Sequence, residues 1–106
     1  MNITDVAIDA KKTLGTQMLL VDIHPVFEYQ DGKRSDTIIG YKYDICLPER
    51  QFEKISVKIL GEQKIENPQD GYTEVVFSDL ELFIYWLRGS YLIGARASDI
   101  NDANSK

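Results

Sequence analysis

The sequence has little of several residue types on which common protein chemistries depend. It contains one cysteine, Cys46, so an intramolecular disulfide is excluded. Its one histidine, His24, has no cysteine or carboxylate at ligand or triad spacing along the chain, so we predict no metal site and no histidine-assisted nucleophile. The seven glycines are dispersed and form no phosphate-binding loop. We therefore expect no catalytic residue and no cofactor, and we predict that the protein is not an enzyme.

Long apolar runs are also missing. No run approaches the roughly 18 residues of a membrane span. The segment "MNITDVAIDAKK" carries acidic residues where a secretory signal would carry basic ones. We therefore expect no membrane partner and a cytoplasmic location.

Basic residues are outnumbered, because 12 Lys and Arg face 17 Asp and Glu and leave a formal net charge of -5. This charge is opposite in sign to that of a typical duplex-DNA-binding domain. Contact with nucleic acid would therefore need a local basic patch together with aromatic stacking. The length of 106 residues and the 43% hydrophobic content fit one folded domain.

Apolar residues alternate with polar ones from Met18 onward, the period of a half-buried strand. Residues 18–47 predict a long β-hairpin around the turn-prone "QDGKRSD", and "FEKISVKIL" predicts a third strand. "TEVVFSDLELFIYWL" and "YLIGARAS" add strands on either side of "RGS", with a break at Ser78 and Asp79. Both faces of "LELFIYWL" are apolar, which predicts a central strand or one covered on both sides.

These patterns predict a mainly β fold with one N-terminal helix, in which five to six short antiparallel strands form a small curled sheet or barrel. The strands occupy a single domain over residues 17–98, and residues 99–106 are a polar tail. The helical spacing of Val6, Ala10 and Leu14 assigns residues 1–16 to the helical segment.

The candidate binding surface is basic and aromatic. Outward positions of neighbouring strands lie side by side, so lysines of strands two and three could continue a stripe from the hairpin tip. Proteins that bind single strands combine such a stripe with rings on which bases stack. The candidate phosphate-binding residues are Lys33, Arg34, Lys42, Lys54 and Lys58, and the candidate stacking residues are Tyr29 and Tyr85. Solvated lysines that protect strand edges would give the same pattern. Tyr41, Tyr43, Phe27 and Trp86 share parity with aliphatic residues and are assigned to the core.

Two stretches, "HPVFEYQDGKRSDTIIGYKYDICLPERQFEKISVKILGEQKI" and "VVFSDLELFIYWLRGSYLIGARASDI", resemble a family of short uncharacterised proteins carried by conjugative elements, plasmids and phages of Gram-positive bacteria. The shared features are two aromatic hairpins, the "FEKISVKI" strand and a closing "ARASDI". More distantly, the organisation resembles small proteins encoded early in conjugative transposons, some of which assist helicase and relaxase replication.

The resemblance implies an OB-like barrel and a non-enzymatic accessory role around single-stranded DNA, with a helicase or relaxase of the element as a second partner. It implies no catalytic residues. The helix that an OB-fold has between strands three and four is replaced here by "GEQKIENPQDGY", so an open sheet packed by the N-terminal helix is an alternative to the barrel. The alternative function is a protein interaction module that uses an exposed strand edge or an apolar sheet face, without nucleic acid. The sequence does not determine the oligomeric state.

Overall fold

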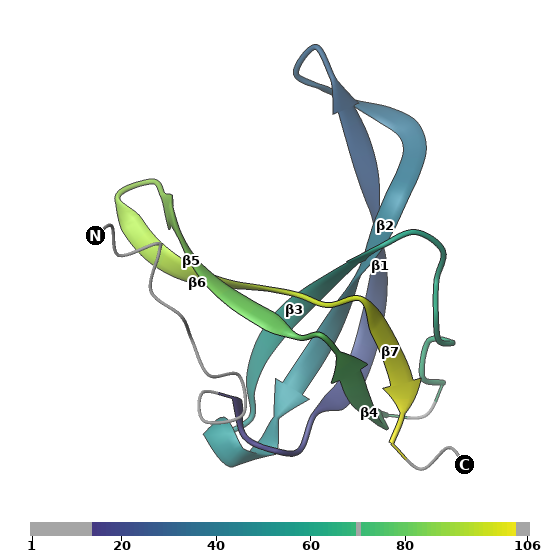
Figure 1. Ribbon diagram of the computed structural model, residues 1–106, viewed down its shortest axis with the longest axis vertical. Coiled ribbons are helices and arrows are strands. Elements are labelled where there is room, and N and C mark those ends of the chain that lie inside the picture. Colours follow the sequence, from purple (N-terminus) through teal and green to yellow (C-terminus); the bar gives the residue numbers. More distant parts are fainter. Residues whose placement is uncertain (1–13, 70, 104–106) are drawn as a thin grey trace.

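The computed structural model describes residues 14–69 and 71–103, and these form one sheet of seven strands (Figure 1). The strands are β1 (Leu19–Gln30), β2 (Lys33–Leu47), β3 (Glu53–Leu60), β4 (Thr73–Ser78), β5 (Glu81–Leu87), β6 (Ser90–Arg96) and β7 (Asp99–Asp102). A short 3-10 helix, η2 (Pro48–Arg50), connects β2 to β3. The predicted N-terminal helix falls almost entirely on residues 1–13, outside the described residues. In the part of the chain that is described, no helix combines the length and the apolar character of a membrane span.

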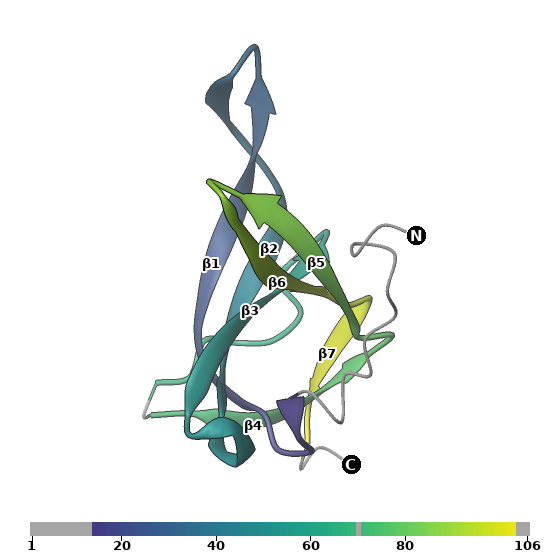
Figure 2. The same cartoon turned by 90° about the vertical axis from the view of Figure 1, so that its left-hand side faces the viewer.

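The strand order is β5-β6-β3-β2-β1-β4-β7, and it corrects part of the predicted fold. The mainly β class is confirmed, but the described sheet has seven strands rather than five or six. It is also not purely antiparallel, because β6 lies parallel to β3 through the pairs Val57 with Ala95 and Lys58 with Arg96. The sheet curls (Figure 2), yet it does not close into a barrel, since β5 and β7 end the order as separate edges.

One hydrophobic core lies on the inner face of the curl. Every strand contributes at least one buried side chain to it, and Leu14 adds another from the segment before β1. The seven largest side chains with almost no exposure are Tyr43, Leu20, Ile45, Ile59, Ile100, Val57 and Val75. The curl allows β4 and β7 to bury their residues against β2 and β3, which lie elsewhere in the strand order.

Two-residue turns join the strands of both long hairpins. Asp31 and Gly32 connect β1 to β2 with φ of 53° and 78°, and Arg88 and Gly89 connect β5 to β6 with φ of 50° and 84°. Positive φ at both central residues is the geometry whose twist matches paired strands, and Asp-Gly is among its preferred sequences. The predicted hairpin over residues 18–47 is confirmed, but its turn is shorter than "QDGKRSD", since pairing reaches Gln30 and Lys33.

Strand β1 is irregular at three points in its pairing with β2. Pro25 pairs in register with Tyr41, while the register shifts between Leu20 and Asp22 and twice more between Val26 and Tyr29. A bulge changes which face the following residues occupy. Leu19 and Leu20 precede the first shift, and both are buried although they are adjacent.

Strand β5 is an edge strand, so the prediction of a central or doubly covered strand is wrong. Its hairpin with β6 projects away from the body (Figure 1), and only its base, at Leu82 and Ala95, reaches the core. Trp86, which parity assigned to the core, is 58% exposed and contacts Tyr91 edge to face at 4.7 Å between ring centroids. The alternation of inward and outward residues in β5 continues past Leu82, where the core ends, so it does not predict the burial of Trp86.

Strand β7 occupies part of the segment predicted as a polar tail. Residues 99–102 pair with β4, and Ile100 is 1% exposed within the core. The preceding corner is fixed by Ser98, whose hydroxyl donates to the Asp79 carboxylate at 2.7 Å and whose backbone N–H donates to the Ser78 carbonyl at 2.9 Å. The predicted break at Ser78 and Asp79 is confirmed, and it separates β4 from β5.

Glu49 in η2 fastens the chain that enters β1. Its Oε2 accepts hydrogen bonds from the backbone N–H of Thr16, from that of Gln17 at 2.7 Å and from the Thr16 hydroxyl at 3.0 Å. The backbone N–H of Gln17 is the largest cause that holds the pKa of Glu49 below its usual value. A carboxyl whose pKa is lowered by folding stabilises the folded state above its unfolded pKa, and this stabilisation is lost as the pH falls through the folded pKa.

We expect Glu49→Gln to lower the melting temperature at pH 7 and to have a smaller effect at pH 3, because the stabilisation by the charged carboxyl decreases as the pH falls below the unfolded pKa toward the folded pKa. Thermal unfolding followed by circular dichroism at the two pH values would measure this. Glu62→Gln, in the exposed loop between β3 and β4, is the matched control. An equal loss at both pH values would show that the charge of Glu49 contributes nothing.

Candidate nucleic-acid interface

A groove lies between the β2–β3 pair and the β5–β6 hairpin, with a volume of about 570 Å³. Three of the predicted phosphate-binding residues, Lys42, Lys54 and Lys58, line it together with the predicted stacking residue Tyr85. Phe83 contributes a second ring. We call this hollow the lysine groove.

Strand register explains why these side chains meet. Lys42 lies directly opposite Lys58, and Lys54 lies opposite Cys46 on the same outward face. The parallel pairing of β3 with β6 then places the β5–β6 hairpin beside this face. Gly94 permits close contact within the hairpin, because a Cβ at this position would lie 2.4 Å from the Phe83 ring.

A second hollow, of about 450 Å³, lies on the outer part of the β1–β2 hairpin. Tyr29 and Arg34, which pair across the two strands, both line it, and Lys42 lines both this hollow and the lysine groove. The Arg34 guanidinium lies over the Phe27 ring at 4.8 Å from its centroid. The two hollows are therefore neighbours that share the Lys42 side chain.

A third hollow, of about 400 Å³, adjoins the lysine groove. It shares Lys58 and Phe83 with that groove and adds Arg96. The Arg96 guanidinium lies 5.0 Å from the Phe83 ring centroid and forms a 3.0 Å ion pair with Glu81. Five cationic side chains thus follow the three connected hollows. We call this set the basic track: Arg34, Lys42, Lys54, Lys58 and Arg96.

Six of the seven predicted binding residues line these connected hollows, and Lys33 does not. Lys33 is exposed at the start of β2, where it pairs with Gln30 beside the turn. Whether any of the seven binds nucleic acid stays a prediction. The residues that sequence reasoning did not select are Arg96, Phe83 and Phe27. No sequence pattern indicated that Arg96 lies beside the lysines, because its position depends on the pairing of β6 with the distant β3.

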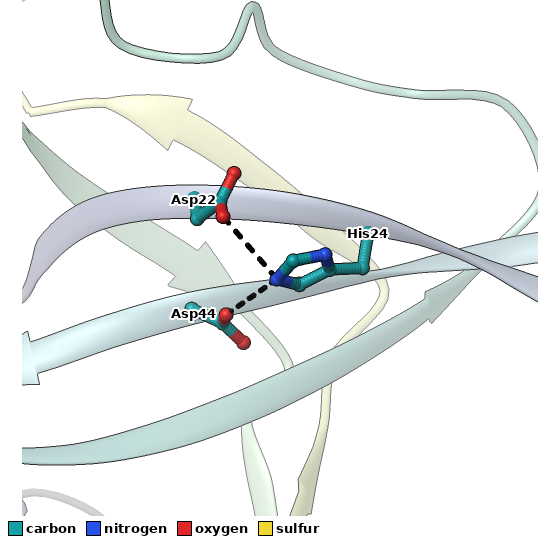
Figure 3. A group of neighbouring side chains, drawn as sticks. All are labelled: Asp22, His24 and Asp44. Carbon is teal, nitrogen blue, oxygen red and sulfur yellow. Dashed lines mark hydrogen bonds and ion pairs between the residues drawn. The ribbon is translucent and has the colours of Figure 1, made fainter.

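Acidic side chains interrupt the same outward face. Asp44 lies opposite Ser56, between the row of Lys42 and Lys58 and the row of Lys54. Figure 3 shows Asp44 and Asp22 on either side of His24, whose Nε2 lies 2.8 Å and 3.3 Å from their Oδ2 atoms. The sequence interpretation, which found no carboxylate at ligand or triad spacing with His24, did not anticipate these two contacts. Two signals were present, the Asp-x-His spacing within one strand and the aspartate on the partner strand.

Asp22 is held in its charged form by its surroundings. The backbone N–H of Ile23 donates to Oδ1 at 2.8 Å, and the Asn67 amide donates to the same oxygen at 3.1 Å. These two hydrogen bonds, with the Ile23 bond the larger cause, keep the pKa of Asp22 below its usual value. The bond from Asn67 also connects the loop between β3 and β4 to β1.

Searches against protein-family models, curated proteins and solved structures found no match to the chain.

Proposed function

We propose that this protein binds single-stranded nucleic acid weakly along the basic track. The observation that carries the proposal is the lysine groove, where three lysines and two aromatic rings from three strands line one hollow. Phosphates would lie against the ammonium groups, and bases would stack on Tyr85 and Phe83, which is how sequence-independent single-strand binders divide their contacts. A ring can accept any base, so we expect little sequence preference.

The strand order supports an OB-like arrangement for this function. β1, β2 and β3 form a meander, β6 lies parallel beside β3, and β4 and β5 pair with β1 and β6 respectively. This is the order of a five-stranded OB Greek key whose fourth strand is divided at the corner after Ser78. OB-folds bind oligonucleotides over strands two and three and at the loops that join strands one to two and four to five. The corresponding features here are the lysine pair on β2–β3, the Asp31–Gly32 turn and the Arg88–Gly89 turn.

The net charge of -5 limits the affinity, and contacts to phosphates make the affinity sensitive to salt. Binding through phosphates releases counterions, so affinity falls as salt rises, while the bulk negative charge repels the strand at low ionic strength. An accessory role follows from weak binding, because such a protein acts beside a more specific one. The resemblance to proteins of mobile elements makes the helicase or relaxase of the element the proposed second partner, with the chain itself non-enzymatic.

Fluorescence anisotropy with a labelled oligo(dT) of about 16 nucleotides, the upper site size of one OB-fold, tests the proposal. We expect a salt-sensitive rise at micromolar protein and low salt. Tyr85→Leu should weaken binding by about 1 to 3 kcal/mol, the contribution of one stacked base. Tyr72→Leu is the control, because Tyr72 is 61% exposed and lies outside the three hollows. No signal, or equal losses in both variants, would refute the proposal.

One observation favours the alternative of a protein interaction surface. The β5–β6 hairpin exposes large apolar side chains on both faces, among them Trp86, Leu87, Tyr91 and Leu92. Exposed apolar surface of this kind marks interaction sites. In this case the protein should self-associate as its concentration rises, and Trp86→Ser should abolish that association in sedimentation velocity experiments without changing oligonucleotide binding.

A further inference from the structure

Three side chains of metal-binding type converge on the outer face of the β1–β2 pair (Figure 3). They are Asp22, His24 and Asp44, and one ligand atom of each lies within 4.8 Å of the other two. The His24 Nε2 is the common point, at 3.3 Å from the Asp22 Oδ2 and 2.8 Å from the Asp44 Oδ2. The cluster adjoins the basic track, because His24 lines the hollow on the outer part of the β1–β2 hairpin and Asp44 lies between the lysine rows of β2 and β3.

Paired strands fix the three residues. Asp22 and His24 are two residues apart in β1 and so point to the same face, and Asp44 is the direct partner of Asp22 on β2. The β1–β2 ladder therefore sets the spacing of the three Cα atoms. Sites carried on such elements hold their ligands more precisely than sites built on loops.

The two carboxylates are also oriented by second partners. The Asp22 Oδ1 accepts from the Ile23 backbone and the Asn67 amide, while the Asp44 Oδ1 accepts from the Ser56 hydroxyl at 2.6 Å. Each aspartate therefore has one oxygen engaged by its surroundings and the other, Oδ2, directed toward His24. Ligand carboxylates in metal sites are held by hydrogen bonds of this kind.

The distances suit a small divalent ion. Zinc lies about 2.0 to 2.2 Å from imidazole nitrogen and carboxylate oxygen, so two ligand atoms of a tetrahedral site are about 3.4 Å apart. The two measured separations from Nε2 are 2.8 and 3.3 Å, and side-chain rotation can adjust the third, which is at most 4.8 Å. We propose that Asp22, His24 and Asp44 bind a divalent transition-metal ion such as Zn²⁺ through His24 Nε2 and the two Oδ2 atoms.

The chemistry of the donor set agrees with this ion class. One imidazole with two carboxylates suits Zn²⁺ and its neighbours, whereas Ca²⁺ and Mg²⁺ prefer oxygen alone. Binding requires Nε2 without a proton, and the ion would lie between the imidazole and the two aspartates. Three protein ligands leave the fourth position of a tetrahedral ion to water. Water can reach the site, because the His24 side chain is 55% exposed and the Asp22 side chain is 49% exposed.

A protonated imidazole that bridges two carboxylates would give the same distances without a metal, and titration separates the two cases. Zn²⁺ is added to the untagged protein while binding is followed by calorimetry and the imidazole nitrogens by NMR. His24 is the single histidine, so each imidazole signal belongs to it. We expect one equivalent of Zn²⁺ to bind, and the Nε2 resonance to shift as a metal-bound nitrogen while Nδ1 keeps its proton.

His24→Gln and Asp44→Asn should each abolish this uptake, and Ser56→Ala should weaken it by about 10- to 100-fold, as loss of a second partner does in known sites. Asp36→Asn, an exposed aspartate of β2 outside the cluster, should leave it unchanged. The proposal is overturned if no Zn²⁺ binds, if Nε2 does not respond, or if His24→Gln takes up as much metal as the native chain.

Discussion

Replacing Lys42, Lys54 and Lys58 together by glutamine should remove about two units from the slope of log affinity against log salt for a single-stranded oligonucleotide. Each phosphate contact with a single strand contributes about 0.7 of a unit to that slope, and the three lysines line one groove. Affinity at low salt should fall correspondingly, while the difference between native and variant protein narrows at high salt. Anisotropy titrations at several salt concentrations would measure both effects.

Lys64→Gln is the matched control for one charge, because Lys64 is exposed in the loop between β3 and β4 and lines none of the three hollows. Compared with it, Lys58→Gln alone should lose about 0.7 of a unit. Equal small changes of the salt slope in the two single variants would mean that only the net charge of the protein affects binding. The groove would then have no role in binding.

The largest loss of stability is expected from Tyr43→Ala. Tyr43 is the largest fully buried side chain and packs in the core cluster with residues of β3 and β4. Truncating a buried aromatic side chain costs about 3 to 5 kcal/mol, a large share of the roughly 5 to 15 kcal/mol that stabilise a domain. Urea unfolding followed by fluorescence would measure the change.

Tyr43→Phe separates packing from hydrogen bonding at the same position. The Tyr43 hydroxyl accepts from the Lys64 backbone N–H at 2.9 Å and so connects the core to the loop between β3 and β4. Loss of this hydrogen bond should cost about 1 kcal/mol.

The Tyr43 hydroxyl also makes stability depend on alkaline pH. Burial is the main cause that raises the pKa of Tyr43 above 10.0. The neutral tyrosine therefore stabilises the fold below that pH, and this contribution is lost as the pH rises through the folded pKa. Tyr43→Phe should therefore be less sensitive to alkaline pH than the native protein, and an unchanged alkaline profile would contradict this assignment.

Local patterns in the sequence predicted much of the fold. The alternation around Tyr43 and Val57 gave the first three strands and their inward faces, and Asp31–Gly32 gave the first turn. These features depend on residues close in sequence or directly paired within a meander, where the pattern itself carries the information.

Features that depend on distant pairing could not be predicted in this way. Trp86 has the parity of a core residue, but the core ends before it because β6 meets β3 at only two residue pairs. Ile100 is an isolated apolar residue in a polar segment of the sequence, and its burial depends on the pairing of β7 with β4. For the candidate site, the sequence predicted that Lys42, Lys54 and Lys58 share a face, whereas the hairpin that completes the groove reaches them only through the parallel pairing of β3 with β6.

The parallel contact between β3 and β6 also has a consequence for how the chain folds. It joins Val57 to Ala95 across the whole of the intervening loop, β4 and β5. Such a contact forms only after a long loop has closed, and folds with many distant pairings reach the native state in milliseconds to seconds rather than microseconds. The β1–β2–β3 meander can assemble from neighbouring residues. We therefore expect the β5–β6 hairpin to join it late, so that the lysine groove is completed in the final steps of folding.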